Sequence, residues 1–126
     1  MEKLTKAEED IMRIIWDLEP CTVADIRNYI EQEQGLEKPP HSTISTLVAN
    51  IREKGYLKHK AYGRTYVYAA QVNKDDYSRG RLKKLVNHFF SGSMDALVSF
   101  MVKEEELSVD ELTDLLKRLE KAEKKK

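Results

Sequence analysis

Apolar residues recur with the period of an α-helix through the first third of the chain. A stripe at three- and four-residue spacing predicts a first helix, formed by Leu4, Ala7, Ile11, Ile14, Ile15 and Leu18. Thr5 and Glu8 form a capping-box pattern at its start, and Pro20 ends it, because the residue before a proline avoids the α conformation. Thr22 is the expected N-cap of a second helix, which runs to about Gln34 and stops at Gly35.

A third helix and a hairpin are predicted after a connector at residues 36–41. The helix runs from about Ser42 to Lys54, with a buried face of Ile44, Leu47, Val48 and Ile51. After Gly55 the pattern alternates, which predicts strands at 56–61 and 65–69, with Gly63 in the turn between them. We expect Leu57, Tyr66 and Tyr68 to anchor the hairpin on the helices, because a lone hairpin is marginal in water. This order of elements predicts a winged helix-turn-helix.

The last third predicts a separate helical module. Its expected helices are residues 73–91, a short one around Met94–Met101, and one after a capping box at Ser108–Glu111. Three short amphipathic helices build little core alone, so we expect their stripes to pair with a second copy of the chain. The residues expected in this dimer core are Leu85, Phe89, Leu97, Val98, Leu112 and Leu116.

The predicted organisation is therefore a mainly α protein with a small β-hairpin. We predict a winged-helix domain at residues 1–72, whose DNA-binding role is argued from its charges and its third helix below, and a helical dimerisation domain at residues 73–126. No apolar run approaches the roughly 20 residues that span a bilayer, and the N-terminus lacks an apolar signal core. These features predict a cytoplasmic protein with no membrane insertion. The single cysteine, Cys21, excludes an intramolecular disulfide framework and a cysteine-rich zinc site.

The formal net charge is zero, with 22 basic and 22 acidic residues, but the charges are unevenly distributed. Residues 1–37 have a balance of −6, and residues 38–64 have a balance of +5. A basic stretch within a neutral chain is typical of a nucleic-acid contact surface. The alternative is an ordinary solvated face, which charge alone does not exclude.

The predicted third helix exposes short polar side chains that suit the reading of base edges. The candidate DNA-reading residues are Ser42, Thr43, Ser45, Thr46 and Asn50. Hydroxyl groups donate or accept hydrogen bonds, and asparagine pairs bidentately with adenine. The alternative is a plain surface helix, although such helices more often carry Lys and Glu. In the hairpin, Lys58, Lys60 and Arg64 are the candidate contacts to backbone phosphates.

Signatures of an enzyme are absent from the sequence. It has no glycine-rich phosphate loop, no histidine pair at i, i+4 and no Gly-x-Ser-x-Gly motif. We therefore predict no catalytic residues, no metal ligands and no cofactor. Cys21 lies at a helix start, where a thiolate could act as a redox sensor, but a buried packing role is favoured.

Several segments together resemble the BlaI/MecI/CopY family of bacterial penicillinase repressors over nearly the whole chain. They are residues 4–8 with Ile14–Trp16, residues 43–47, residues 54–57, and Leu97–Val98 with residues 107–112. The resemblance implies a winged helix, a helical dimerisation domain and repression through palindromic operator DNA. In antibiotic-responsive members it also implies a membrane sensor coupled to proteolytic cleavage of the repressor.

The sequence departs from the family pattern at three places. Ser45 and Asn50 stand where the family often has arginine, so the operator sequence is not transferable. Phe100–Met101 occupies the cleavage position, where the antibiotic-responsive members have an Asn–Phe bond. No cysteine follows Cys21, which argues against copper sensing.

The resulting hypothesis is a dimeric transcriptional repressor that binds palindromic operators and regulates β-lactam resistance. The alternatives are a winged-helix module that binds protein instead of DNA and, more remotely, an enzyme.

Overall fold

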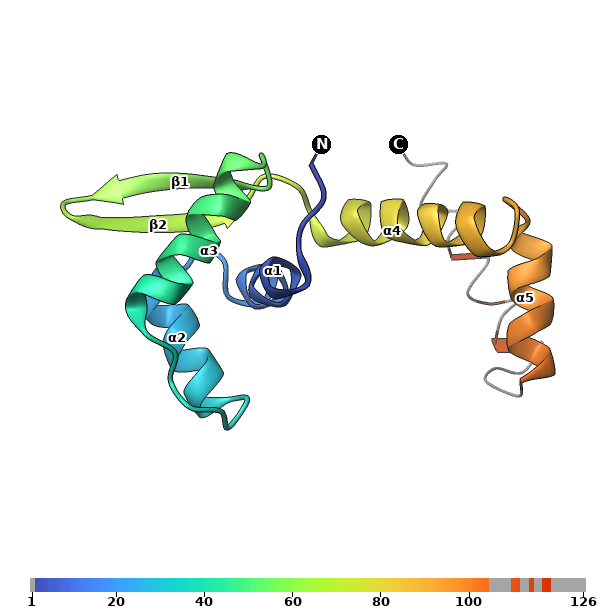
Figure 1. Ribbon diagram of the computed structural model, residues 1–126, viewed down its shortest axis with the longest axis horizontal. Coiled ribbons are helices and arrows are strands. Elements are labelled where there is room, and N and C mark those ends of the chain that lie inside the picture. The colour runs from blue at the N-terminus through green and yellow to red at the C-terminus, as the bar shows by residue number, and fades with distance from the viewer. Residues whose placement is uncertain (1, 105–109, 112–113, 115–116, 119–126) are drawn as a thin grey trace. The chain divides into compact units, whose positions relative to one another are not determined.

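The computed structural model describes residues 2–104, 110–111, 114 and 117–118. The chain divides into two compact units, Met1–Ser78 and Arg79–Lys126. Their elements in chain order are α1 (Lys6–Leu18), α2 (Val23–Gln32), α3 (His41–Glu53), β1 (Leu57–Tyr62), β2 (Thr65–Ala70), α4 (Lys74–Phe89) and α5 (Met94–Lys103). The described part is mainly helical with one antiparallel hairpin, as the sequence predicted (Figure 1).

The first two helices begin at the capping boxes that the sequence predicted. The Thr5 hydroxyl accepts a hydrogen bond from the Glu8 N–H at 3.2 Å, and the Glu8 carboxylate accepts from the Thr5 N–H at 2.8 Å. Thr22 and Asp25 make the same reciprocal pair at the start of α2. α2 ends at Gln32, slightly before the predicted end at Gln34.

The first three helices enclose one hydrophobic core. Met12 and Ile15 of α1, Ile26 of α2, and Val48 and Ile51 of α3 have no exposed surface. Burying large aliphatic side chains of this kind contributes roughly 1.5–3 kcal/mol each. The helical stripes read from the sequence therefore meet at one centre, as predicted for α1, α2 and α3.

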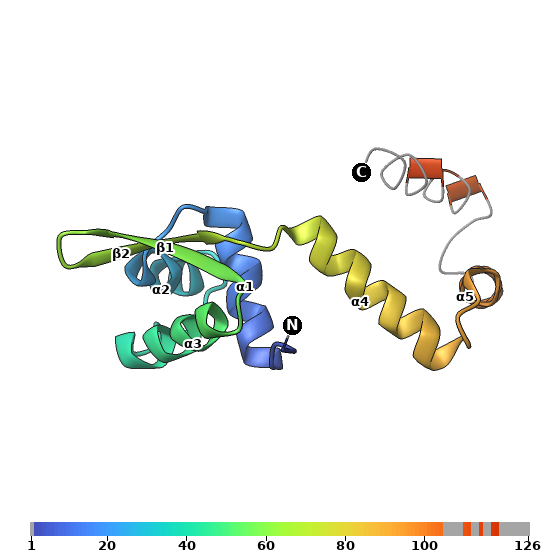
Figure 2. The same cartoon turned by 90° about the horizontal axis from the view of Figure 1, so that it is seen from above.

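The hairpin is attached to this core by its base. Leu57 pairs with Ala70 at the base, and Tyr62 pairs with Thr65 next to the turn, where Gly63 has a φ of +64°. A third strand segment joins it, because the N–H of Cys21 donates to the Tyr68 carbonyl at 3.0 Å and the N–H of Tyr68 donates to the Cys21 carbonyl at 2.7 Å. Three helices, a hairpin and this bridge make a winged helix (Figure 2).

One predicted anchor of the hairpin is wrong. Leu57 and Tyr68 are buried, but Tyr66 is 50% exposed. The hairpin extends away from the three helices toward its turn, as Figure 1 shows, and Tyr66 pairs with Ala61 in the part near the turn. Alternation placed Tyr66 on the correct face, but the helical core does not reach that far.

The division between the units lies further along the chain than the domain boundary expected after residue 72. The first turn of α4 belongs to the first unit because Tyr77 packs against it. The Tyr77 ring lies 5.3 Å from the Trp16 ring and 5.9 Å from the Tyr56 ring, and its hydroxyl donates to Glu9. The Trp16 indole N–H donates to the Val72 carbonyl at 2.9 Å.

The rest of α4 and α5 make up most of the described part of the second unit, to which the helical residues 110–111, 114 and 117–118 also belong. Gly92 has a φ of +78° between them, and the Ser93 hydroxyl caps α5 by accepting from the Ala96 N–H at 3.1 Å. Val86 is buried, and the rings of Phe90 and Phe100 lie 5.8 Å apart. The predicted capping box at Ser108 and the residues Leu112 and Leu116 lie outside the described residues. None of the described helices is long and apolar enough to cross a membrane.

Candidate nucleic-acid interface

α3 buries one face in the core and presents a polar face to solvent. Ile44, Val48 and Ile51 are buried. On the outer side Ser42, Thr43, Thr46 and Asn50 are exposed and Ser45 is half-buried, so all five predicted reading residues lie on accessible parts of the helix. The helix starts one residue earlier than predicted, at His41, and ends at Glu53.

The start of α3 is positioned by the connector rather than by a capping side chain. Pro40 is the N-cap residue and makes no side-chain cap bond. The guanidinium of Arg27, on α2, donates to the Pro39 carbonyl at 2.8 Å and so ties the connector to α2. The Thr43 N–H donates to the Pro40 carbonyl at 3.1 Å. Because no side chain caps this first turn, the N–H groups of His41 and Ser42 can donate to an outside acceptor such as a phosphate oxygen.

The C-terminal end of α3 is fixed by a buried ion pair. Lys54 Nζ lies 2.5 Å from Glu8 Oε1 and also donates to the Lys3 carbonyl at 3.1 Å. Burial alone would raise the pKa of Glu8, but the hydrogen bonds from Lys54 and Thr5 and the Lys54 charge outweigh it and hold the pKa below its usual value of 4.5. Glu8 is therefore ionised, and it links the start of α1 to the end of α3.

The two faces of the hairpin carry different side chains. Lys58 and Lys60 are exposed on the same face, and the Lys60 ammonium lies 5.5 Å from the centre of the Tyr62 ring. Arg64 is exposed in the turn. The predicted wing residues are thus all accessible, but the two lysines lie on the face of the hairpin opposite to His59.

His59 and its neighbours extend the polar surface from α3 onto the hairpin, which the sequence reasoning missed. Arg52 Nη1 donates to His59 Nε2 at 3.3 Å, and the His59 ring lies 5.0 Å from the exposed Tyr66 ring. Through these two contacts, Arg52 in the last turn of α3 is connected to His59 on β1 and, beyond it, to Tyr66 on β2. Strand alternation puts His59 opposite to the lysines, but only the packing shows that this face meets α3.

Cys21 is a packing residue. It is 1% exposed. Burial, together with the charges of Asp25 and Glu19, raises the pKa of its thiol to about 11. The thiolate needed for redox sensing is therefore scarce near neutral pH, and the packing role favoured by the sequence fits this environment.

The predicted dimer residues of the second unit are only partly covered within one chain. Phe89 is 71% exposed and Leu85 is 43% exposed, whereas Leu97 and Val98 are half-buried. The candidate cleavage bond, Phe100–Met101, lies inside α5, and the Phe100 carbonyl accepts from the Glu104 N–H at 3.0 Å.

The fold and its exposed polar helix define a winged-helix protein with a surface suited to DNA. A family model described as penicillinase repressor matches residues 4–121. The chain therefore belongs to the penicillinase repressor family, a family of transcriptional repressors, and its function is DNA-binding repression rather than catalysis.

Two curated relatives and one solved structure illustrate the similarity. The chain is 24% identical to the penicillinase repressor of Bacillus licheniformis, covering 98% of this chain and 94% of that protein. It is 29% identical to the methicillin resistance regulatory protein MecI of Staphylococcus aureus strain N315, with 94% of each covered. The solution structure of the DNA-binding domain of the repressor BlaI matches with a TM-score of 0.48 and 25% identity, covering 61% of this chain and 94% of that one.

Proposed function

We propose that the protein represses transcription as a homodimer that binds a palindromic operator. Each protomer inserts α3 into the major groove, where Thr43, Ser45, Thr46 and Asn50 read base edges and Ser42 contacts the backbone. The observation that carries this proposal is the outer face of α3, whose first turns carry accessible, uncharged and short polar side chains. Because such side chains are short and uncharged, they let the helix come close to base edges and form hydrogen bonds with them.

The hairpin supplies sequence-independent affinity in this proposal. Lys58, Lys60 and Arg64 are exposed and lie within the stretch of residues 38–64 that has a balance of +5. Contacts from these cations to phosphates would release counterions and make binding depend on salt.

Dimerisation is proposed to occur through the second unit. Leu85 and Phe89 lie one helical turn apart on α4 and are exposed in a single chain, and α5 contributes Leu97 and Val98. Exposed apolar side chains at helical spacing favour burial against a second copy. The predicted contribution of Leu112 and Leu116 remains part of the proposal. A two-fold dimer would match a two-fold symmetric operator.

Regulation of β-lactam resistance genes is the biological role that we propose, because the relatives above are named for penicillinase and methicillin resistance. This role places the protein in the cytoplasm with the bacterial chromosome. Where a membrane sensor and a protease inactivate the repressor, we propose Phe100–Met101 as the bond cut. Its place inside α5 requires local unfolding before cleavage.

The proposal is tested by titrating the protein against DNA from immediately upstream of its own gene. Fluorescence anisotropy at fixed salt should show binding at least about 1,000-fold tighter than to a shuffled duplex of the same composition. Equal affinity for the two duplexes would contradict sequence-specific repression. No affinity for either duplex would favour the alternative, in which the winged helix binds protein.

A further inference from the structure

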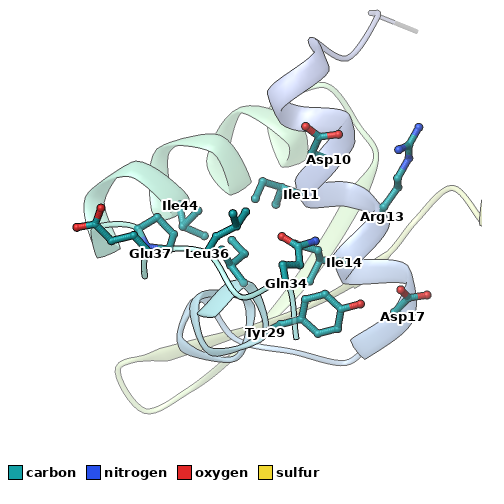
Figure 3. A pocket seen from close by; sticks show the side chains of 12 residues that line it. Asp10, Ile11, Arg13, Ile14, Asp17, Tyr29, Gln34, Leu36, Glu37 and Ile44 are labelled. Carbon is teal, nitrogen blue, oxygen red and sulfur yellow. The ribbon is translucent and has the colours of Figure 1, made fainter. Parts of the chain in front are cut away.

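An acidic groove lies between α1, α2 and the connector, within the first unit (Figure 3). It has a volume of about 600 Å³. Its apolar lining consists mainly of Ile11 and Ile14 of α1, Ile30 of α2, Leu36 of the connector and Ile44 of α3. Figure 3 shows the side chains of Ile11, Leu36 and Ile44 gathered at its centre.

Carboxylates outnumber cations around this apolar lining. Asp10 and Asp17 lie on α1, two helical turns apart, and Glu37 lies across from them on the connector. Arg13 is the single cation among the lining residues, and its guanidinium is paired with Glu9 at 3.3 Å. Asp10 in turn lies 4.0 Å from Lys6, an exposed lysine that does not line the groove. The three carboxylates and one guanidinium of the lining sum to −2, so the groove combines a buried apolar floor with a negative rim.

DNA binding leaves this surface unexplained. All the charged residues that line the groove belong to the stretch of residues 1–37, which has a balance of −6, whereas the proposed DNA surface lies in residues 38–64, with a balance of +5. Phosphate would be repelled by Asp10, Asp17 and Glu37. Their arrangement around the exposed side chain of Leu36, above a floor of buried isoleucines, instead complements a positively charged ligand.

We propose that this groove binds a small organic cation with an apolar body, such as an aromatic or alkyl ammonium or phosphonium ion. The volume lies within the range of about 300–1,000 Å³ that is typical of small-molecule sites. The apolar body would cover Leu36, which is 60% exposed, and the positive charge would lie toward Asp10 and Asp17. A bare metal ion fits less well, because isoleucine and leucine side chains occupy the centre of the groove.

The ligand would touch the element that carries the proposed DNA-reading residues. Ile44 of α3 lines the groove and stands between Thr43 and Ser45 in the sequence. Pro39 also lines the groove, and its carbonyl is held by Arg27. The binding proposal itself does not depend on DNA binding and is tested without DNA.

The test uses two probe ions of nearly the same shape and opposite charge, tetraphenylphosphonium and tetraphenylborate. Each is titrated into the full-length protein by isothermal calorimetry. We expect one tetraphenylphosphonium per chain. Its affinity should fall about two- to fivefold in Asp10→Asn and again in Asp17→Asn, as for exposed ion pairs. Leu36→Ala should also weaken it severalfold, because the apolar body of the ion then covers less hydrophobic surface.

The matched control is Glu31→Gln, which removes an exposed carboxylate of α2 that does not line the groove. It should leave the affinity for tetraphenylphosphonium unchanged, and Asp10→Asn should not weaken any binding of tetraphenylborate. Circular dichroism confirms that each variant is folded. The proposal is overturned if tetraphenylphosphonium does not bind, or if its affinity is the same in the wild type and in the three groove variants. Binding of an oligolysine peptide but not of tetraphenylphosphonium would also overturn it, because the groove would then be a peptide site.

Discussion

The two units of the chain differ in how well each one buries its own apolar residues. In the first unit Met12, Ile15, Ile26, Val48 and Ile51 are all completely buried in one core. Among the described residues of the second unit, Val86 is the only buried hydrophobic residue, whereas Leu85, Phe89 and Phe100 are between 43% and 71% exposed. The apolar stripes look similar in the sequence, but among the described residues the stripes of the first unit are buried within one chain, whereas those of α4 and α5 stay largely exposed.

This difference in burial fits a different role for each unit. A closed core holds α3 and the hairpin in a fixed geometry, which a DNA-reading surface needs. In the proposed dimer, the exposed apolar side chains of α4 and α5 would be buried against a second copy. The comparison therefore predicts that substitutions in the core of the first unit lower the free energy of unfolding of one chain, whereas substitutions on the apolar face of the second unit weaken dimerisation.

The strongest way to break the comparison is to separate the two units. A fragment of residues 1–78 keeps Tyr77 on Trp16 and Tyr56, so it should fold as a monomer. Its affinity for a palindromic operator should fall by about 100- to 10,000-fold, because two linked half-site contacts become one. Analytical sedimentation and DNA titration measure the two effects. A dimeric fragment would show that the first unit carries the interface.

Replacing one large apolar side chain by alanine in each unit should affect unfolding in the first unit and dimer dissociation in the second. Ile15→Ala leaves a cavity in the closed core and should lower the free energy of unfolding by about 3 kcal/mol. Phe89→Ala should leave thermal unfolding of the 1–78 core unchanged but raise the dimer dissociation constant of the full chain by about tenfold. Denaturation and sedimentation at several protein concentrations distinguish them. The contrast fails if Phe89→Ala leaves dimerisation intact.

The buried ion pair should make the first unit sensitive to acid. Glu8→Gln removes the carboxylate that pairs with Lys54 and should lower the free energy of unfolding by about 2–3 kcal/mol at pH 7. Since the folded-state pKa of Glu8 is lowered, its contribution is present above the unfolded pKa and is lost as the pH falls through the folded pKa. Urea denaturation between pH 7 and pH 3 measures this loss.

The control for that variant is Asp10→Asn on the same helix. Asp10 is exposed and lies 4.0 Å from Lys6, so its replacement should change stability by less than about 0.5 kcal/mol. The destabilisation caused by Glu8→Gln should shrink toward low pH, where the wild-type carboxylate is also protonated. A difference that stays constant down to pH 3 would argue against the ion pair as its cause.

Within the first unit, α3 and the hairpin should contribute to DNA binding in different ways. Thr46→Ala should weaken the free energy of operator binding by about 1–3 kcal/mol and relax the preference for one base at the position that Thr46 contacts. Replacing Lys58, Lys60 and Arg64 by alanine in one triple variant should weaken binding to all DNA sequences alike. The slope of the logarithm of the binding constant against the logarithm of the salt concentration should fall in magnitude by about one unit for each phosphate that is no longer neutralised. A salt series on specific and shuffled duplexes measures both. An unchanged slope would remove the hairpin from the interface.

Cys21 offers the smallest test of the closed core. With a pKa of about 11 and almost no exposed surface, its thiol should react with iodoacetamide at pH 8 many times more slowly than free cysteine. The rate should rise to that of an ordinary thiol in denaturant. Rapid alkylation of the native protein, followed by mass spectrometry, would revive the redox-sensor interpretation.

The sequence alone determined the elements of the first unit and the face of α3 that meets solvent. Capping boxes at Thr5 and Thr22 and the turn at Gly63 depend on hydrogen bonds and backbone angles within a few residues, so local pattern is sufficient to predict them. The helical period likewise separated Ile44 and Val48 from Thr46 and Asn50, because burial on a helix follows from spacing.

Only the tertiary structure decided which distant residues meet. The pairing of Glu8 with Lys54, the strand bridge between Cys21 and Tyr68, and the packing of Tyr77 on Trp16 join segments that are far apart in the chain. The exposure of Tyr66, the contact of His59 with Arg52 and the acidic groove depend on where the hairpin and the connector lie beside the helices. Periodicity says which side of an element is apolar, but it does not say how far the neighbouring element extends to cover it.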